Sequence, residues 1–271
     1  MEPKLELISL DTIELQERPD RERLKILVAG MDKSQVLRDP PIVARGLRGK
    51  LIQLDGTTRL MALKALGCTH AVVQVVDYND SSQVLIKSWV HVSKVNRKKF
   101  LGHLKSIKNV LTEGFKLGLG LTLTGHPLAV ASIIFRDGKG LSIVGGYDLF
   151  KRVKLIQNVV DLYSALISRD REISIESMGQ LKEFFQKHKE KNVALFFPSF
   201  SAQEIFALMK KGVILPQGIT RHIVNGRLLR INYPLEMLKA GLSLAKKKAF
   251  FKSFVDKLTV RFYEESTWVV D

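Results

Sequence analysis

The sequence predicts an α/β (α+β) fold, and its patterning carries that prediction. Short strand-like runs alternate with helical runs over residues 5–92. Within that stretch, a strand, a sharp turn and a capped helix follow one another over 51–67. Strands and helices also alternate beyond residue 93. We therefore expect two regions, a compact first region at 1–92 and a second α/β region at 93–271.

The first region has a regular order of elements. We expect strands at 5–10, 41–44, 51–54, 71–76 and 84–92, with helices near 20–30 and at 57–66. Gly67 follows the second helix, where a left-handed cap is typical. In the strand at 84–92, side chains alternate between faces, so Lys87, Trp89 and His91 share one face. The other face is apolar, and we expect Trp89 and His91 to face a cleft.

The second region begins with a helical stretch and continues with a glycine-punctuated β segment. A hairpin turn is predicted at 135–140, helices near 148–168 and 178–190, and a strand at 192–197. Ser201 and Glu204 have the spacing of a capping box ahead of the next helix. Gly118 and Gly120 lack the third glycine of a dinucleotide-binding fingerprint, so we interpret them as structural.

A polar cluster occupies the segment 220–231, which predicts a hairpin of two strands joined by a two-residue turn at Asn225-Gly226. Alternation puts Thr220 and His222 on one face of the first strand and Arg221 on the other. Histidine in a strand is often only a hydrogen-bonded structural residue. A Thr/Arg/His cluster on a tight hairpin is also typical of a clamp for a carboxylate or phosphate.

Composition narrows the class of protein. The 271 residues carry 43 Lys and Arg against 27 Asp and Glu, a net charge of +16, which favours anionic partners. The lysine clusters are also typical of solvated helix faces, so nucleic acid is the weaker candidate partner. The apolar runs are too short to span a membrane, and no signal peptide is recognisable. The single cysteine, Cys68, excludes an internal disulfide and a cysteine-rich zinc site. We expect a cytoplasmic protein, and the sequence does not define its oligomeric state.

The turn at 55–59 is the strongest candidate site. Gly56 permits a sharp bend after Asp55, and Thr57 and Thr58 open a helix whose first N–H groups lack intrahelical partners. Arg59 adds a planar cation at the positive end of the helix dipole. These features are typical of an anion site, most plausibly for a phosphate. A strand-to-helix turn that merely uses threonine as a cap would have the same pattern, so the turn alone leaves both interpretations open.

A family resemblance extends from this turn to nearly the whole chain. The segment Asp55-Gly56-Thr57-Thr58-Arg59 resembles the phosphate-binding turn of the ParB/sulfiredoxin superfamily. The chain is similar, in order and spacing, to the free L-serine kinases of that superfamily, which include an archaeal enzyme and a homologue from the staphyloferrin B siderophore cluster. The motifs that carry this similarity are Gln16-Glu17, Ser88–His91, Gly212–His222 and the closing 254–270, while the match is weak over 100–190.

The resemblance implies a phosphotransferase with an alcohol acceptor. Such an enzyme transfers a phosphoryl group from ATP or ADP, with Mg²⁺, to the hydroxyl of L-serine and forms O-phospho-L-serine. It also implies that the first region is a ParB/sulfiredoxin-like nucleotide-binding domain and that the second region completes the serine site. By the same resemblance the residues have roles: Glu17 as catalytic base, Asp55 as second catalytic carboxylate, Gly56, Thr57, Thr58 and Arg59 as phosphate ligands, and Trp89, Thr220, Arg221 and His222 as serine ligands.

The turn departs from the family pattern, which has one or two histidines before the arginine. Thr57 and Thr58 stand there instead. Threonine keeps a hydroxyl donor and the backbone N–H, so phosphate binding is retained, but an acid or base role at these positions is not. Sulfiredoxin chemistry is excluded because it needs a cysteine in the turn, and Cys68 lies beyond the end of the helix.

Phosphoryl transfer itself agrees with this assignment. It requires donors to the phosphates, Mg²⁺ and an aligned nucleophile more than covalent chemistry. Glu17 and Asp55 supply two carboxylates, and we favour Glu17 as the base that accepts the serine proton. No direct metal motif is present, so Mg²⁺ is expected on the phosphates, with Asp55 as its candidate protein ligand. Taken alone, a glutamate beside Arg18 is typical of a surface ion pair, and Trp89 of a core aromatic.

Two other function classes stay open at this point. A ParB-like, nucleotide-dependent DNA-binding regulator would fit the charge of +16, although no helix-turn-helix is recognisable in 93–190. A non-catalytic nucleotide sensor would fit the threonines of the turn. The sequence does not distinguish ATP from ADP, or serine from a related hydroxy amino acid.

Overall fold

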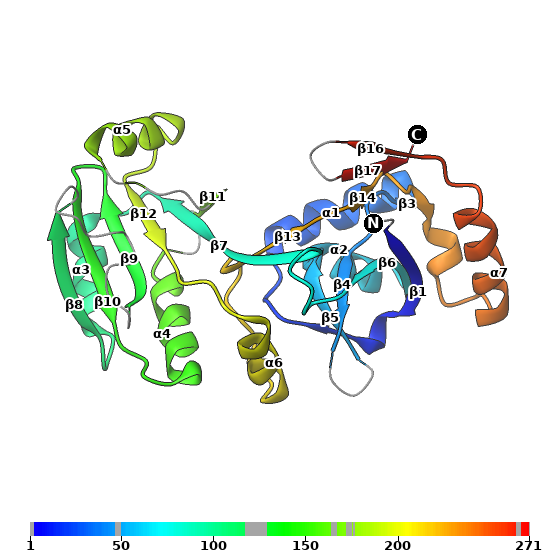
Figure 1. Cartoon of the computed structure of the whole chain (residues 1–271), viewed down its shortest axis with the longest axis horizontal. Helices are drawn as coiled ribbons and strands as arrows, with labels where there is room; N and C mark the ends of the chain where they lie inside the picture. Colours follow the sequence, from blue (N-terminus) through cyan, green and yellow to red (C-terminus); the bar gives the residue numbers. More distant parts are fainter. Residues whose placement is uncertain are drawn as a thin grey trace. The chain divides into compact units, whose positions relative to one another are not determined.

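The computed structural model describes residues 3–46, 50–116, 129–163, 167–171, 175, 177–263 and 267–270. They form a mixed α/β fold with helices and several sheets (Figure 1), which confirms the predicted fold class. The chain folds as two compact units, Met1–Leu85 with His222–Asp271, here unit 1, and Ile86–Arg221, here unit 2. Gly118 and Gly120 lie outside the described residues.

The units differ from the division at 92/93 that the sequence suggests. The segment from His222 onward packs with the N-terminal residues and not with the middle of the chain. Tyr233, Leu235 and Leu238 are fully buried in the same hydrophobic core as Leu60 and Leu63. Burial of these apolar side chains joins the two ends of the chain into one unit, a long-range pairing that has no local sequence signal.

Unit 1 is built on a five-stranded sheet with the order β1-β6-β4-β5-β2. Its elements in chain order are β1 (Lys4–Ser9), η1 (Leu10–Thr12), β2 (Ile13–Leu15), α1 (Arg21–Ser34), β3 (Val36–Leu37), β4 (Ile42–Arg45), β5 (Leu51–Asp55), α2 (Thr57–Ala65) and β6 (His70–Val76). After the excursion into unit 2, the chain adds β14 (Arg227–Leu229), β15 (Tyr233–Pro234), η4 (Leu235–Leu238), α7 (Leu244–Val255), β16 (Val260–Tyr263) and β17 (Thr267–Val270).

The sheet and the helices of unit 1 share one core. Val43, Ala71 and Val73 from the sheet are fully buried with Leu63 of α2. Partly buried side chains of α1 and α7, among them Leu27 and Phe254, pack against this core. Such burial stabilises the unit by roughly 25 cal/mol for each Å² of apolar surface removed from water. The core therefore fixes α2, and with it the turn at 55–59, against the sheet.

The predicted hairpin at 220–231 is wrong as a pairing of strands, although its turn exists. Of the described strands, β13 (Thr220–Val224) pairs with β7 (Val84–Ser93), whereas β14 pairs in parallel with β17. The turn residues bind β6 and the segment that follows it instead of closing a two-stranded ladder. The Asn225 N–H donates to the Gln83 carbonyl (2.9 Å), and the Gly226 carbonyl accepts from the Gln74 side chain (2.9 Å).

Unit 2 contains the remaining elements: α3 (Arg97–Ser106), β8 (Leu111–Lys116), β9 (Ala129–Phe135), β10 (Lys139–Val144), α4 (Leu149–Asp161), β11 (Ser168–Arg171), α5 (Met178–Lys187), β12 (Val193–Phe196) and α6 (Ala202–Lys210). Its sheet has the order β11-β7-β12-β9-β10-β8. The predicted hairpin β9–β10 forms, and the capping box of Ser201 and Glu204 opens α6 as expected. Within the described part of the chain, no helix is long and apolar enough to cross a bilayer.

Candidate active site

The turn after β5 has the predicted strand-turn-helix geometry. Asp55 ends β5, and Gly56 follows in the left-handed region with φ 89° as the N-cap of α2. This backbone conformation favours glycine, which carries no side chain to cap the helix. Thr57 is buried and Thr58 is half-buried at the first turn of α2. The start of α2 is therefore a helix N-terminus of the kind that binds anions.

Arg59 is held by contacts within unit 1. Its Nη1 donates to the Asp39 carbonyl (2.8 Å) and the Pro40 carbonyl (2.9 Å), and its Nη2 donates to Asp55 Oδ2 (2.7 Å). The guanidinium group thus ties the start of α2 both to the loop before β4 and to the Asp55 carboxylate. Its role as a phosphate ligand stays a prediction, and these contacts give it a second role in fixing Asp55.

A second arginine, which sequence analysis does not single out, lies on the same carboxylate. Arg227 of β14 donates from Nη2 to Asp55 Oδ2 at 2.5 Å. Burial by itself would raise the pKa of Asp55, but Arg59, Arg227 and the Gly56 backbone N–H outweigh it and hold that pKa below its usual value. Asp55 is consequently ionised at neutral pH and is a weak proton acceptor.

Glu17 lies at the same edge of the sheet as Asp55. Strands β2 and β5 are parallel, with Leu15 opposite Gln53. β2 ends at Leu15, so Glu17 follows it by two residues, whereas Asp55 is the last residue of β5. Both residues therefore lie at or just beyond the carboxyl ends of adjacent parallel strands. Ligands of open α/β sheets bind at such ends. Glu17 thus follows the strand next to the one that Asp55 ends, and the catalytic roles of both residues stay predictions.

His222 also lies in unit 1, where it is surrounded by polar groups. Its Nε2 is 2.8 Å from the Tyr78 hydroxyl, its ring bonds the Leu54 carbonyl, and the amide of the buried Gln16 lies 3.5 Å from the ring. A carbonyl only accepts, so a ring N–H of His222 donates to Leu54, and the Tyr78 hydroxyl is the partner of Nε2. Desolvation lowers the pKa of His222 to about 4, against a smaller opposing effect of Asp55. His222 is thus neutral, and both of its ring nitrogens are engaged.

The other predicted serine ligands belong to unit 2. The Arg221 guanidinium lies over the Trp89 ring, 4.9 Å from its centroid, in a cation–π contact. Thr220 is buried at the start of β13. His91 is fully buried within unit 2, between the Tyr163 hydroxyl (3.0 Å) and the Gly218 carbonyl (2.7 Å), so the expectation that it faces a cleft is wrong. Its residue type suits this interior position because both ring nitrogens find partners.

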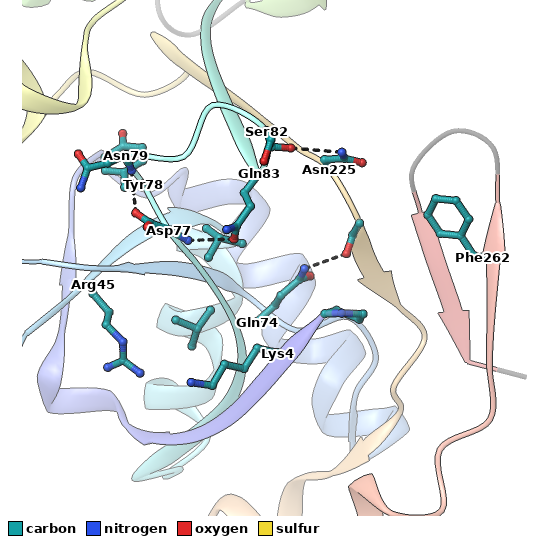
Figure 2. A pocket seen from close by; sticks show the side chains of 14 residues that line it. Lys4, Arg45, Gln74, Asp77, Tyr78, Asn79, Ser82, Gln83, Asn225 and Phe262 are labelled. Atoms are coloured by element: carbon teal, nitrogen blue, oxygen red, sulfur yellow. Dashed lines mark hydrogen bonds between the residues drawn. The ribbon is translucent and has the colours of Figure 1, made fainter. Parts of the chain in front are cut away.

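Unit 1 also contains an open pocket of about 760 Å³ (Figure 2). Its wall includes Lys4 and Arg45, which both pair with Glu6, and the amides of Gln74 and Asn225. These amides already donate within the chain, to the Gly226 and Ser82 carbonyls respectively. The two amides are therefore already hydrogen-bonded within the chain and the two cations are already paired with Glu6. Asn225 and Gly226 of the turn form part of the pocket wall.

The described residues contain no group of three His, Cys, Asp or Glu side chains that could hold a metal ion. Mg²⁺ at nucleotide sites is commonly held by substrate phosphates and one or two carboxylates. Both arginines bond Asp55 through Oδ2, so neither occupies Oδ1. The residues present thus fit an ion held chiefly by phosphates, with Asp55 as the candidate protein ligand.

Sequence reasoning misses Arg227, Gln74 and Tyr78 at this site. Arg227 is 172 residues away from Asp55 along the chain, and Tyr78 is 144 residues away from His222. Arg227 directly follows the Asn225-Gly226 turn, which is the one local feature that marks its position. No pattern in a single sequence shows that this turn returns to β5.

Comparisons with known proteins identify the class of protein that has this fold. No protein-family model matches the chain. A solved free serine kinase in complex with AMP has a TM-score of 0.65 and 19% identity, with 88% of this chain and 95% of that chain covered. A conserved hypothetical protein from Pyrococcus furiosus has a TM-score of 0.66 and 19% identity, with 88% and 98% covered. The chain therefore has the fold of the free serine kinases.

A particular relative is recognised from sequence as well. The chain is homologous to the ATP-dependent L-serine kinase SbnI of Staphylococcus aureus, with 25% identity over 270 residues, 98% of this chain and 97% of that protein. A structure of SbnI with a C-terminal truncation has a TM-score of 0.69, 24% identity, and 93% and 95% of the two chains covered. The resemblance to the free L-serine kinases is confirmed, while the wider relationship to the ParB/sulfiredoxin superfamily stays a prediction.

Proposed function

We propose that this protein is a free L-serine kinase that transfers a phosphoryl group from ATP to the L-serine hydroxyl and forms O-phospho-L-serine. The observation that carries the proposal is the parallel pairing of β2 and β5: Asp55 ends β5 directly before α2, and Glu17 follows the end of the neighbouring strand β2. Homology to an ATP-dependent L-serine kinase along 98% of the chain supports the same activity. ADP is the alternative donor.

The start of α2 is the proposed phosphate site. The backbone N–H groups and hydroxyls of Thr57 and Thr58 would donate to phosphate oxygens, aided by the helix dipole, and Gly56 would let a phosphate approach the backbone closely. Arg59 contributes positive charge next to this site while it is held by Asp55 and two backbone carbonyls. Catalysis of this type depends on donors that are fixed before the substrate arrives.

The two carboxylates have different proposed roles. Asp55 is a weak base because two guanidinium groups hold it ionised, so Glu17 is the better candidate to accept the serine proton. As the serine oxygen bonds to the γ-phosphorus, the bond from that phosphorus to the bridging oxygen breaks. The nucleoside diphosphate leaves with the electron pair. Mg²⁺, when bound, would neutralise charge on the phosphates.

The proposed serine ligands are Trp89, Thr220, Arg221 and His222. Arg221, placed over the Trp89 ring, is the candidate partner for the substrate carboxylate, because a guanidinium group binds a carboxylate in a bidentate way. His222 is neutral and has both ring nitrogens engaged, so we propose that it positions the site. We also place this kinase in the cytoplasm.

The experiment that tests the proposal follows O-phosphoserine by ³¹P NMR with serine or threonine and with ATP or ADP. We expect O-phosphoserine from serine and ATP. Glu17→Gln should lower kcat by about 10²–10⁴, the usual contribution of a general base, with little change in nucleotide affinity. Glu22→Gln is the control, since Glu22 is exposed on α1 and pairs with Lys25.

Two outcomes would contradict this proposal at different levels. A Glu17→Gln variant with wild-type kcat would remove Glu17 from the mechanism but leave the activity. Absence of O-phosphoserine with every nucleotide, for a folded wild-type protein that still binds nucleotide, would instead support the non-catalytic sensor.

A further inference from the structure

Arg227 contacts Asp55 of the candidate site although the two residues are 172 positions apart in the sequence. It begins β14, and its Nη2 lies on the same oxygen of Asp55 as that of Arg59. The Arg227 side chain is 35% exposed and that of Asp55 37% exposed. Two guanidinium groups on one oxygen fix the direction of the carboxylate and leave Oδ1 outside both ion pairs.

A buried amide holds the start of β14 in place. Gln74 of β6 is 2% exposed, and its Nε2 donates to the Gly226 carbonyl (2.9 Å). Its Oε1 accepts from the Leu228 N–H (2.9 Å). Figure 2 shows Gln74 reaching from the sheet to the Asn225-Gly226 turn. The amide therefore bonds the backbone on both sides of Arg227 and fixes the residue from which that side chain extends.

The turn itself has further attachments. The Asn225 N–H donates to the Gln83 carbonyl (2.9 Å), and the Asn225 side chain donates to the Ser82 carbonyl (3.2 Å). On its other side, β14 pairs in parallel with β17, with Arg227 opposite Thr267. A residue held in this way loses little backbone freedom when its side chain forms an ion pair, so the geometry at Asp55 is preorganised.

We propose that Arg227 is a positioning residue for phosphoryl transfer, which holds the Asp55 carboxylate in its working orientation from β14. The inference rests on the proposed function and names a residue that acts through Asp55. Arginine suits this role better than lysine, because its planar fork keeps a fixed geometry and a permanent charge. Arg59 shares the contact, but it is also bound to the loop before β4, so the two arginines fix Asp55 from separate elements.

The test compares Arg227→Ala and Arg227→Lys with a matched control, Arg97→Ala. Arg97 pairs with Asp137 at 2.8 Å, and their side chains are 37% and 47% exposed. We expect Arg227→Ala to lower kcat by about 10–100-fold while the KM for serine changes less than about twofold, because an interaction that matters in the transition state is lost. Arg227→Lys should recover part of kcat, and guanidinium ions at low millimolar concentration should recover part of kcat for Arg227→Ala only. Arg97→Ala should keep wild-type kcat.

Several results would overturn this role: wild-type kcat in Arg227→Ala, or a loss that neither lysine nor guanidinium restores. An equal loss of kcat in Arg97→Ala would do the same. A readout independent of activity is the double-mutant cycle of Arg227→Ala and Asp55→Asn in chemical unfolding, where we expect coupling of about threefold or more in the unfolding constant. An inactive wild-type protein with this coupling would refute the kinase but keep Arg227 as the partner of Asp55. Additive effects would refute the partnership itself.

Discussion

Two histidines of this chain, one in each unit, have the same chemical surroundings. His222 lies against Tyr78, and His91 lies against Tyr163, and each ring bonds both a tyrosine hydroxyl and a backbone carbonyl. Desolvation lowers the pKa of each to about 4. Both imidazoles are therefore neutral at pH 7, and the positive charge around Asp55 comes from Arg59 and Arg227.

These pairs give a prediction with an internal control. The Tyr78 hydroxyl donates to neutral His222 and so favours the neutral form. Tyr78→Phe should raise the pKa of His222 above about 4, whereas Tyr163→Phe should raise only the pKa of His91. The measurement is an NMR titration of the histidine rings in both variants. If the pKa of His222 is the same in Tyr78→Phe and in the wild-type protein, the bond from Tyr78 does not favour the neutral form of the ring.

At the scale of elements, the Asn225-Gly226 turn shows why strand pairing is harder to predict than strand position. The residues have the dipeptide of a tight turn, and Gly226 has a positive φ of 71°, but Asn225 does not, so the turn is not the type I′ turn of a two-residue hairpin. The pairing that follows depends on Gln74 of β6 and on Gln83 of the segment after β6, which both bind the turn. The turn follows from its own residues, whereas the partners of β13 and β14 depend on contacts with residues distant in sequence, such as the buried Gln74 amide.

Loss of that amide should release β14. Gln74→Leu keeps the side-chain volume similar but leaves the Gly226 carbonyl and the Leu228 N–H without their buried partner, which costs about 1–3 kcal/mol for each unsatisfied group. We expect a lower denaturation midpoint together with a lower kcat, because Arg227 loses its anchor. Gln203→Leu, on an exposed position of α6, is the control for the substitution type. Wild-type stability in Gln74→Leu would mean that the pairing with β17 suffices to hold β14.

The candidate site was predictable where its signals are local. The turn at 55–59 has its glycine, its helix start and its carboxylate within five consecutive residues, and the structure has the expected geometry there. The contacts of Arg59 with Asp39 and Pro40, and of Arg227 with Asp55, were not predictable, because they depend on which loops the tertiary fold brings together. Sequence similarity supplied Glu17, whose neighbours alone indicate a surface ion pair.

At the scale of the whole molecule, the positive charge is uneven. Unit 2 contains 22 of the 43 Lys and Arg but 10 of the 27 Asp and Glu, a net +12, and the remaining 21 and 17 give unit 1 a net +4. The proposed phosphate ligands and the two proposed catalytic carboxylates thus belong to unit 1, which has the smaller net positive charge. An unspecific attraction for polyanions is expected to come mainly from unit 2.

The dependence on salt distinguishes a kinase from a DNA-binding regulator. Binding of duplex DNA by a solvated basic surface should be indifferent to sequence and should fall steeply with salt, because it depends on counterion release. Formation of O-phosphoserine should persist at salt concentrations that abolish DNA binding, since a preorganised site is screened less. A salt titration of both activities on one preparation measures the difference. Sequence-specific, salt-resistant DNA binding without O-phosphoserine would favour the regulator.

The division of unit 1 into 1–85 and 222–271 also bears on the order in which the chain folds during translation. Unit 2 is continuous in sequence, so it can fold as soon as the ribosome has released it. The Asp55 turn is synthesised early, yet its partners Arg227 and His222 leave the ribosome only after unit 2. A nascent chain stalled before residue 222 therefore has every predicted phosphate ligand, but it lacks the β14 arginine that completes the surroundings of Asp55.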